Sequence, residues 1–159
     1  MRDPEIEEEF PALRADGYAI ASPETPTPNC IGWVLGDHGH FWDPQLVGFK
    51  GMYYWPPGIP RDDRLVTWIQ LFGLFGYREC AGPGQEAGLE KIVIYADDSG
   101  DAQHVAKQLE TGEWGSKLGS DKDISHATPE GLRGSRYGRP ATFMSRQSGV
   151  VTSQENADG

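Results

Sequence analysis

Residues 91–118, KIVIYADDSGDAQHVAKQLETGEWGSKL, carry the pattern that predicts the fold. The opening segment KIVIYA is β-branched and apolar, as in a central strand, and the acidic DDSGD run after it is typical of a turn. A second strand is predicted over residues 104–109 and a third over 114–118, with a hairpin turn at Thr111 and Gly112 between them. We therefore expect a β-meander.

Two helices are predicted before this meander. Asn29 is a strong N-cap type and Gly36 a common helix end, so residues 30–35 are predicted to form a short helix. Apolar residues spaced by three and four over residues 65–75 predict a longer amphipathic helix, capped by Asp62 or Asp63. It should be the main helix packed on the sheet.

After the meander we expect a short strand at residues 124–126, a helical turn at 128–132 and a final strand over 137–144. Together these elements predict an α+β fold with N-terminal helices packed on an antiparallel sheet. The chain has 159 residues, which suits one domain over residues 1–146. Small polar residues predict a flexible tail over 147–159.

Charge and composition exclude several classes of partner. The net charge of −10 disfavours nucleic acid and anionic lipid, because phosphate binding needs clustered lysine and arginine. The N-terminal sequence MRDPEIEEEF is acidic where a secretory signal would be basic, and no run of eighteen apolar residues occurs. We expect a cytoplasmic protein in which Cys30 and Cys80 are free thiols.

Cys30 is the best candidate for a nucleophile. A thiol in the first turn of a helix feels the positive end of the helix dipole, which favours the reactive thiolate. His104, at the head of a predicted strand, is the candidate general base, and His126 could orient it as the third group of a triad. The competing interpretations are a small buried core cysteine and two structural or surface histidines.

Three segments resemble the papain-like cysteine hydrolases: NCIGW at residues 29–33, HVAKQL at 104–109 and WGSKLG at 114–119. The resemblance is greatest to the cysteine- and histidine-dependent amidohydrolases and peptidases, which include bacterial cell-wall endopeptidases. A family of uncharacterised bacterial domains is similar as well. The resemblance implies a papain-like fold, with Cys30 as nucleophile, His104 as base, and either Ser116 or His126 as the third group.

Two further residues are candidates for substrate contacts. The Asn29 side chain could join the Cys30 backbone N–H in an oxyanion hole, because papain's usual glutamine donor is missing upstream. Lys117 could bind a substrate carboxylate, although a solvated lysine on a strand is the commoner outcome. No cofactor is implied.

The sequence does not predict a metal site. The segment DHGHFWD contains Asp37, His38, His40 and Asp43, but no second cluster would complete a coordination shell and known motifs space their ligands differently.

The sequence therefore predicts a cysteine-dependent amide or peptide hydrolase, a thiol protease or amidase that acts through a Cys30 thioester. Its partner would be a peptide or another amide-containing substrate. The alternative is a non-catalytic interaction module, such as an immunity or toxin-system protein, on the same fold and with a protein partner.

Overall fold

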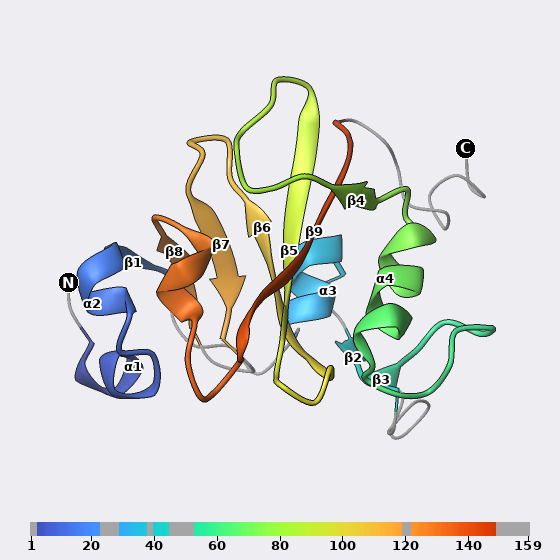
Figure 1. The fold of residues 1–159 in the computed structure, drawn as a ribbon, viewed down its shortest axis with the longest axis horizontal. Coiled ribbons are helices and arrows are strands. Elements are labelled where there is room, and N and C mark those ends of the chain that lie inside the picture. Colours follow the sequence, from blue (N-terminus) through green and yellow to red (C-terminus); the bar gives the residue numbers. More distant parts are fainter. Residues whose placement is uncertain (1–2, 23–28, 38–39, 45–52, 119–121, 149–159) are drawn as a thin grey trace.

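The computed structural model describes residues 3–22, 29–37, 40–44, 53–118 and 122–148 (Figure 1). The helices are α1 (Pro4–Glu9), α2 (Leu13–Asp16), α3 (Cys30–Leu35), α4 (Leu65–Gly73) and the 3-10 helix η2 (Pro129–Leu132). The strands are β1 (Tyr18–Ser22), β2 (Phe41–Trp42), β3 (Tyr53–Tyr54), β4 (Arg78–Cys80), β5 (Leu89–Ala96), β6 (Ala102–Gln108), β7 (Trp114–Lys117), β8 (Asp123–His126) and β9 (Arg139–Gln147).

Seven strands form one sheet in the order β1-β8-β7-β6-β5-β9-β4, and every neighbouring pair is antiparallel. The run from β5 to β8 follows chain order, which confirms the predicted meander. β1 joins one edge by pairing with β8, and β9 lies between β5 and β4 at the other side. The short strands β2 and β3 form a separate parallel pair.

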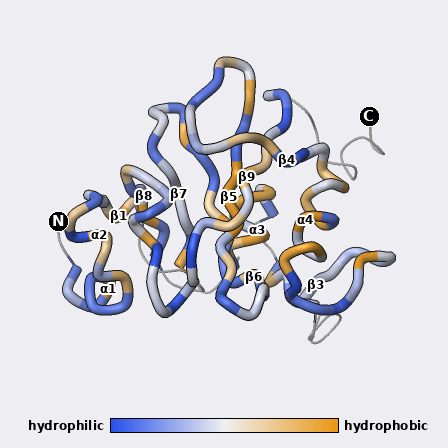
Figure 2. Tube along the Cα trace, in the orientation of Figure 1, coloured by the Kyte–Doolittle hydropathy of each residue, from blue (hydrophilic) through white to orange (hydrophobic). Residues whose placement is uncertain are grey.

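Both faces of the sheet are apolar at its centre, as strand β5 shows. Ile92 and Ile94 belong to a core cluster with α3 and α4, whereas Val93 and Tyr95 belong to a second cluster with α1, α2 and η2. Successive side chains of a strand point to opposite faces, so the two clusters lie on opposite sides of β5. Figure 2 shows apolar residues gathered where β5, α3 and α4 meet.

The predicted papain-like α+β fold is wrong. The structure is dominated by the seven-stranded antiparallel sheet, and its few helices are short. They do not form an N-terminal layer on that sheet, because α1 and α2 pack in one core cluster and α3 and α4 in the other. The physical reason is that β5 is apolar on both faces, so each face needs a cover.

The short helix predicted at residues 30–35 is confirmed as α3. The Asn29 Oδ1 atom accepts a hydrogen bond from the Gly32 N–H, which satisfies a free donor of the first turn. Gly36 ends the helix in the left-handed region at φ 80°, and the Asp37 N–H closes the end on the Gly32 carbonyl.

The longer helix is confirmed as α4, but its N-cap differs from the prediction. Arg64 occupies the cap position and has no side-chain cap bond, while Asp62 accepts hydrogen bonds from the Arg64 N–H and the Thr67 hydroxyl. Asp63 does not cap the helix either: its Oδ1 atom accepts a hydrogen bond from the Trp68 indole of α4, and the residue lines a cavity described below. None of the helices in the described ranges is long and apolar enough to cross a membrane.

The predicted tail begins inside β9, which continues to Gln147. Residues 149–159 lie outside the described part of the chain, so the flexible tail stays a prediction.

Candidate functional site

Cys30 is the first residue of α3 and is only 8% exposed. Its sulfur lies close to strand β6, where the Val105 backbone N–H favours the thiolate form. Burial raises the pKa of the Cys30 thiol to about 11, although the N–H groups of Val105, Ile31 and Cys30 itself act in the opposite direction. The side chain is therefore a neutral thiol near pH 7.

His104 lies on β6 and is completely buried. Its ring stacks on Tyr137 with the ring centroids 4.2 Å apart and an interplanar angle of 1°, and Tyr95 lies 5.5 Å away on the same measure. Neither ring nitrogen has a hydrogen-bond partner in the described structure. Burial holds the pKa of His104 well below its usual value, and the nearby His126 lowers it further, so the imidazole is neutral.

The side chains of Cys30 and His104 lie on opposite faces of the sheet. His104 is paired with Tyr95 across the β5–β6 ladder, and paired residues of neighbouring strands share a face. Val105, the next residue, points to the other face, where it packs in the same cluster as Cys30. No hydrogen bond joins the thiol to the imidazole, because both ring nitrogens are without partners.

One cavity of about 260 Å³ nevertheless has both residues in its wall, together with Asn29, Trp42, Asp63 and Tyr137. We call it the Cys30 cavity. In the described ladder, β6 pairs with β7 at Lys107 and Gln108. The earlier part of β6, which carries His104, does not pair with β7 in the described ladder. The Cys30 cavity lies beside this open part of the strand, so residues from both faces of β6 can line it.

His126 is bound to other groups and does not orient His104. The Ser116 hydroxyl lies 2.9 Å from its Nε2 atom, and its Nδ1 atom lies 2.8 Å from the Thr128 carbonyl oxygen. A carbonyl can only accept, so Nδ1 carries the proton and Nε2 accepts from Ser116. Burial lowers the pKa of His126, which is consistent with this neutral tautomer. The structure thus brings Ser116 and His126 together, but as a buried pair.

Asn29 and Lys117, the other two predicted substrate contacts, are both held within the protein. Asn29 is anchored to β2, because its Nδ2 donates to the Trp42 carbonyl at 2.8 Å and its Oδ1 accepts from the Trp42 N–H at 3.1 Å. Lys117 is only 1% exposed and is not among the described residues that line the Cys30 cavity. It is therefore not the solvated strand lysine that the sequence suggested.

Asp37 joins two residues of the segment that contains the candidate metal ligands. Asp37 contacts the His40 Nδ1 atom at 3.0 Å and accepts a hydrogen bond from the Trp42 indole N–H at 2.9 Å. His38 lies outside the described residues. Across the described ranges, no three histidine, cysteine, aspartate or glutamate side chains are grouped as metal ligands.

Sequence reasoning missed Asp63 and Tyr137 as residues of the cavity wall. Asp63 was expected only as a possible helix cap, and Tyr137 only as the start of a strand. Neither has a local sequence signal for this role, because the cavity forms from segments that are distant along the chain.

The fold and the cavity define an antiparallel-sheet protein in which a buried cysteine and a buried histidine line one cavity. The chain belongs to the family described as Domain of unknown function (DUF7689), whose sequence model matches residues 19–145. No curated protein and no solved structure matches the chain. The matched range contains Cys30, His104 and His126.

Proposed function

We propose that the protein is a cysteine-dependent amide or peptide hydrolase, with Cys30 as nucleophile and His104 as general base. One observation carries the proposal: His104, a fully buried histidine whose two ring nitrogens have no hydrogen-bond partner, is a lining residue of the same cavity as Cys30. An unsatisfied buried polar group costs roughly 1–3 kcal/mol, so its presence calls for an explanation. The proposed role of His104, which takes a proton from Cys30 and passes it to the substrate, would explain why these nitrogens have no other partner.

Both groups are neutral, so a ring nitrogen of His104 has a lone pair that can accept the Cys30 proton. The lowered pKa of His104 and the raised pKa of Cys30 oppose this transfer, so the proposed step requires substrate binding to bring the two pKa values closer together. The sulfur then attacks the amide carbonyl carbon, and His104 returns the proton to the leaving nitrogen as the C–N bond breaks. Water, deprotonated by His104, attacks the thioester, which releases the carboxylate and restores the thiol.

The mechanism requires a movement of His104. Its ring must turn from its stack on Tyr137 toward the sulfur, because the two groups share a cavity without a hydrogen bond. The Cys30 backbone N–H is the natural donor for the oxyanion that develops on the substrate. We expect the protein to act in the cytoplasm, where free thiols such as Cys30 and Cys80 persist.

The test is the rate of Cys30 alkylation by iodoacetamide near pH 7.5, measured by mass spectrometry in a Cys80→Ser chain. If His104 takes the thiol proton, a His104→Gln substitution slows alkylation about tenfold or more, since general bases typically contribute at least that much. The matched control is His40→Gln, which removes a partly exposed histidine outside the Cys30 cavity. Thermal unfolding establishes that each variant is folded.

Equal alkylation rates with and without His104 would overturn the proposal. They would favour the non-catalytic interaction module, in which Cys30 is a small core residue and the cavity performs no chemistry.

A further inference from the structure

We propose that the Cys30 cavity selects substrates that carry an alkylammonium group, such as a lysine side chain, and that the Asp63 carboxylate binds this group. The inference rests on the proposed function, because it names the substrate class of the same site. It is drawn from the charges and rings of the cavity wall.

Asp63 is held in place while its carboxylate keeps capacity to bind a ligand. Its backbone carbonyl accepts a hydrogen bond from the Ala102 N–H at 2.7 Å, and its Oδ1 accepts one from the Trp68 indole at 3.1 Å. Two carboxylate oxygens offer about four acceptor positions. In the described structure Asp63 forms no ion pair, so a cationic ligand would meet an uncompensated carboxylate.

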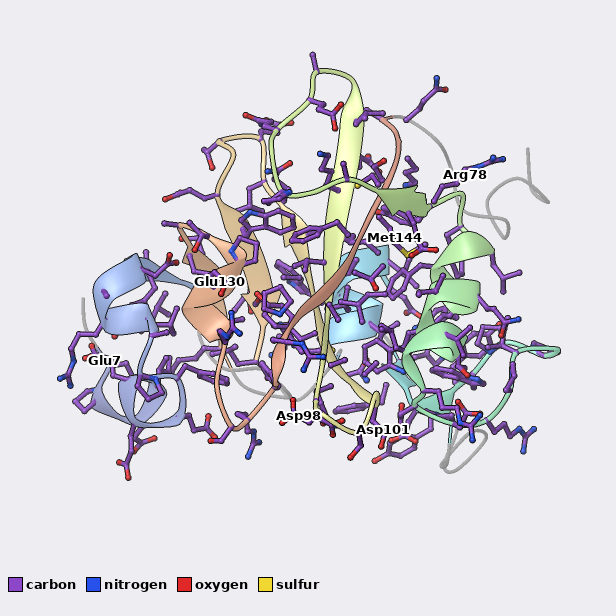
Figure 3. All side chains as sticks on the ribbon, viewed as in Figure 1. Glu7, Arg78, Asp98, Asp101, Glu130 and Met144 are labelled. Atoms are coloured by element: carbon purple, nitrogen blue, oxygen red, sulfur yellow. The ribbon has the colours of Figure 1, made fainter. Side chains whose placement is uncertain are left out.

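Other carboxylates strengthen the negative field at this point. Burial raises the pKa of Asp63, and the charges of Asp43, Asp101 and Asp62 raise it further. Asp43 lies in the cavity wall as well. Figure 3 shows Asp101 at the end of the sheet that adjoins α4, the helix that follows Asp63 in the chain. A bound cation would relieve this repulsion, whereas an anion would add to it.

The arginine in the wall does not cancel this field. Arg136 lines the cavity, but its guanidinium lies 3.7 Å from the Glu9 carboxylate and its side chain is 60% exposed. It is therefore paired toward the surface, and its charge is screened by solvent.

Aromatic walls and size define the cation further. Trp42, Trp68 and Tyr137 line the cavity, and aromatic faces attract ammonium groups while they shelter an aliphatic stem. A volume of about 260 Å³ is below the usual range for whole drug-sized ligands, so it suits one side chain.

The test compares two probes, Nα-acetyl-lysine methylamide and the uncharged Nα-acetyl-norleucine methylamide, by NMR titration of the Trp68 indole N–H in a Cys30→Ser chain. We expect the lysine probe to bind about tenfold or more tightly, as a hydrogen bond to a charged group predicts. Asp63→Asn should reduce the preference to within about twofold. Asp98→Asn, which removes the same charge at a fully exposed residue, should leave it unchanged.

Equal affinities, no binding of either probe, or a preference that survives Asp63→Asn would each overturn the inference. Binding in the Cys30→Ser chain needs no turnover, so the result is independent of the alkylation test. A His104-dependent thiol without lysine selectivity removes this inference alone. If the probes show lysine selectivity but the Cys30 alkylation rate does not depend on His104, the proposed function is wrong and the cavity is a cation-binding site.

Discussion

The imidazole of His104 lies parallel to the phenol ring of Tyr137, with the ring centroids 4.2 Å apart. This stack holds the candidate base among the aromatic residues of one face, while Cys30 packs in the core cluster of the other face. The two groups nevertheless share a cavity. The proposed reaction therefore depends on how easily the imidazole leaves the stack.

Replacing Tyr137 should change the reactivity of Cys30. An aromatic pair is worth about 0.5–1.5 kcal/mol beyond its buried area, so Tyr137→Leu should raise the population of the turned imidazole about two- to tenfold. Alkylation of Cys30 by iodoacetamide should accelerate by a similar factor in a Cys80→Ser chain. Tyr137→Phe keeps the ring and should leave the rate close to that of the parent. If Tyr137→Leu still accelerates alkylation of Cys30 after His104→Gln, the acceleration comes from greater exposure of Cys30 and not from His104.

The free energy of unfolding should decrease at both ends of the pH range. His104 and His126 have lowered pKa values in the folded protein. Below about pH 6.5 these histidines bind protons in the unfolded chain but stay neutral in the folded one, so the free energy of unfolding decreases as the pH falls. Urea unfolding at a series of pH values measures this decrease. A free energy of unfolding that stays constant from pH 7 down to pH 5 would contradict it.

The alkaline decrease has a different cause. The Cys30 pKa rises from 9.0 to about 11 on folding, so the folded chain keeps a proton that the unfolded chain releases above pH 9. This favours unfolding by roughly 2–3 kcal/mol once the pH reaches the folded value. The raised pKa values of Tyr77 and Tyr95 act in the same direction. Cys30→Ala should reduce the slope of the free energy of unfolding between pH 9 and 11, and an unchanged slope would contradict this assignment.

Two glycines should respond differently to the same substitution. Gly138 and Gly36 both have left-handed backbones, at φ 83° and 80°. A Cβ atom at Gly138 would lie 2.0 Å from the Ala96 carbonyl oxygen, whereas nothing lies within 4 Å of one at Gly36. Gly36→Ala should cost about 1–2 kcal/mol of unfolding free energy, the usual cost of this conformation. Gly138→Ala should cost more than 3 kcal/mol, because backbone must move. Chemical denaturation compares the two, and equal losses would show that the Gly138 backbone moves without cost.

The local elements could be predicted from the sequence because their signals are local. Asn29 and Gly36 define α3 through a side-chain cap and a left-handed helix end. The β-branched run at residues 91–96 predicts β5, and turn residues predict the hairpins of the meander. These signals do not say which face of a sheet a helix covers, and the papain-like arrangement was wrong for that reason.

The candidate site was less predictable than the elements that carry it. A shift of one residue along β6 exchanges the faces, so the sequence could not decide whether His104 or Val105 would point toward Cys30. It also could not show that Ser116 would bind the Nε2 atom of His126. Nor could the sequence show that Asp62 would bond the Arg64 N–H and the Thr67 hydroxyl, whereas Asp63 would bond the Trp68 indole and line the cavity.

The sequence by itself determined the short helix that begins at Cys30, the β-meander, and the acidic, aromatic-rich composition. Capping, turn formation and β-branching act over a few residues, so these elements can be predicted from a single sequence. Only the tertiary structure decided that helices cover both faces of the sheet, and that the residues Cys30, His104 and Asp63 line one cavity. Those relationships depend on strand register and long-range pairing, in which residues far apart in the chain compete for the same buried space.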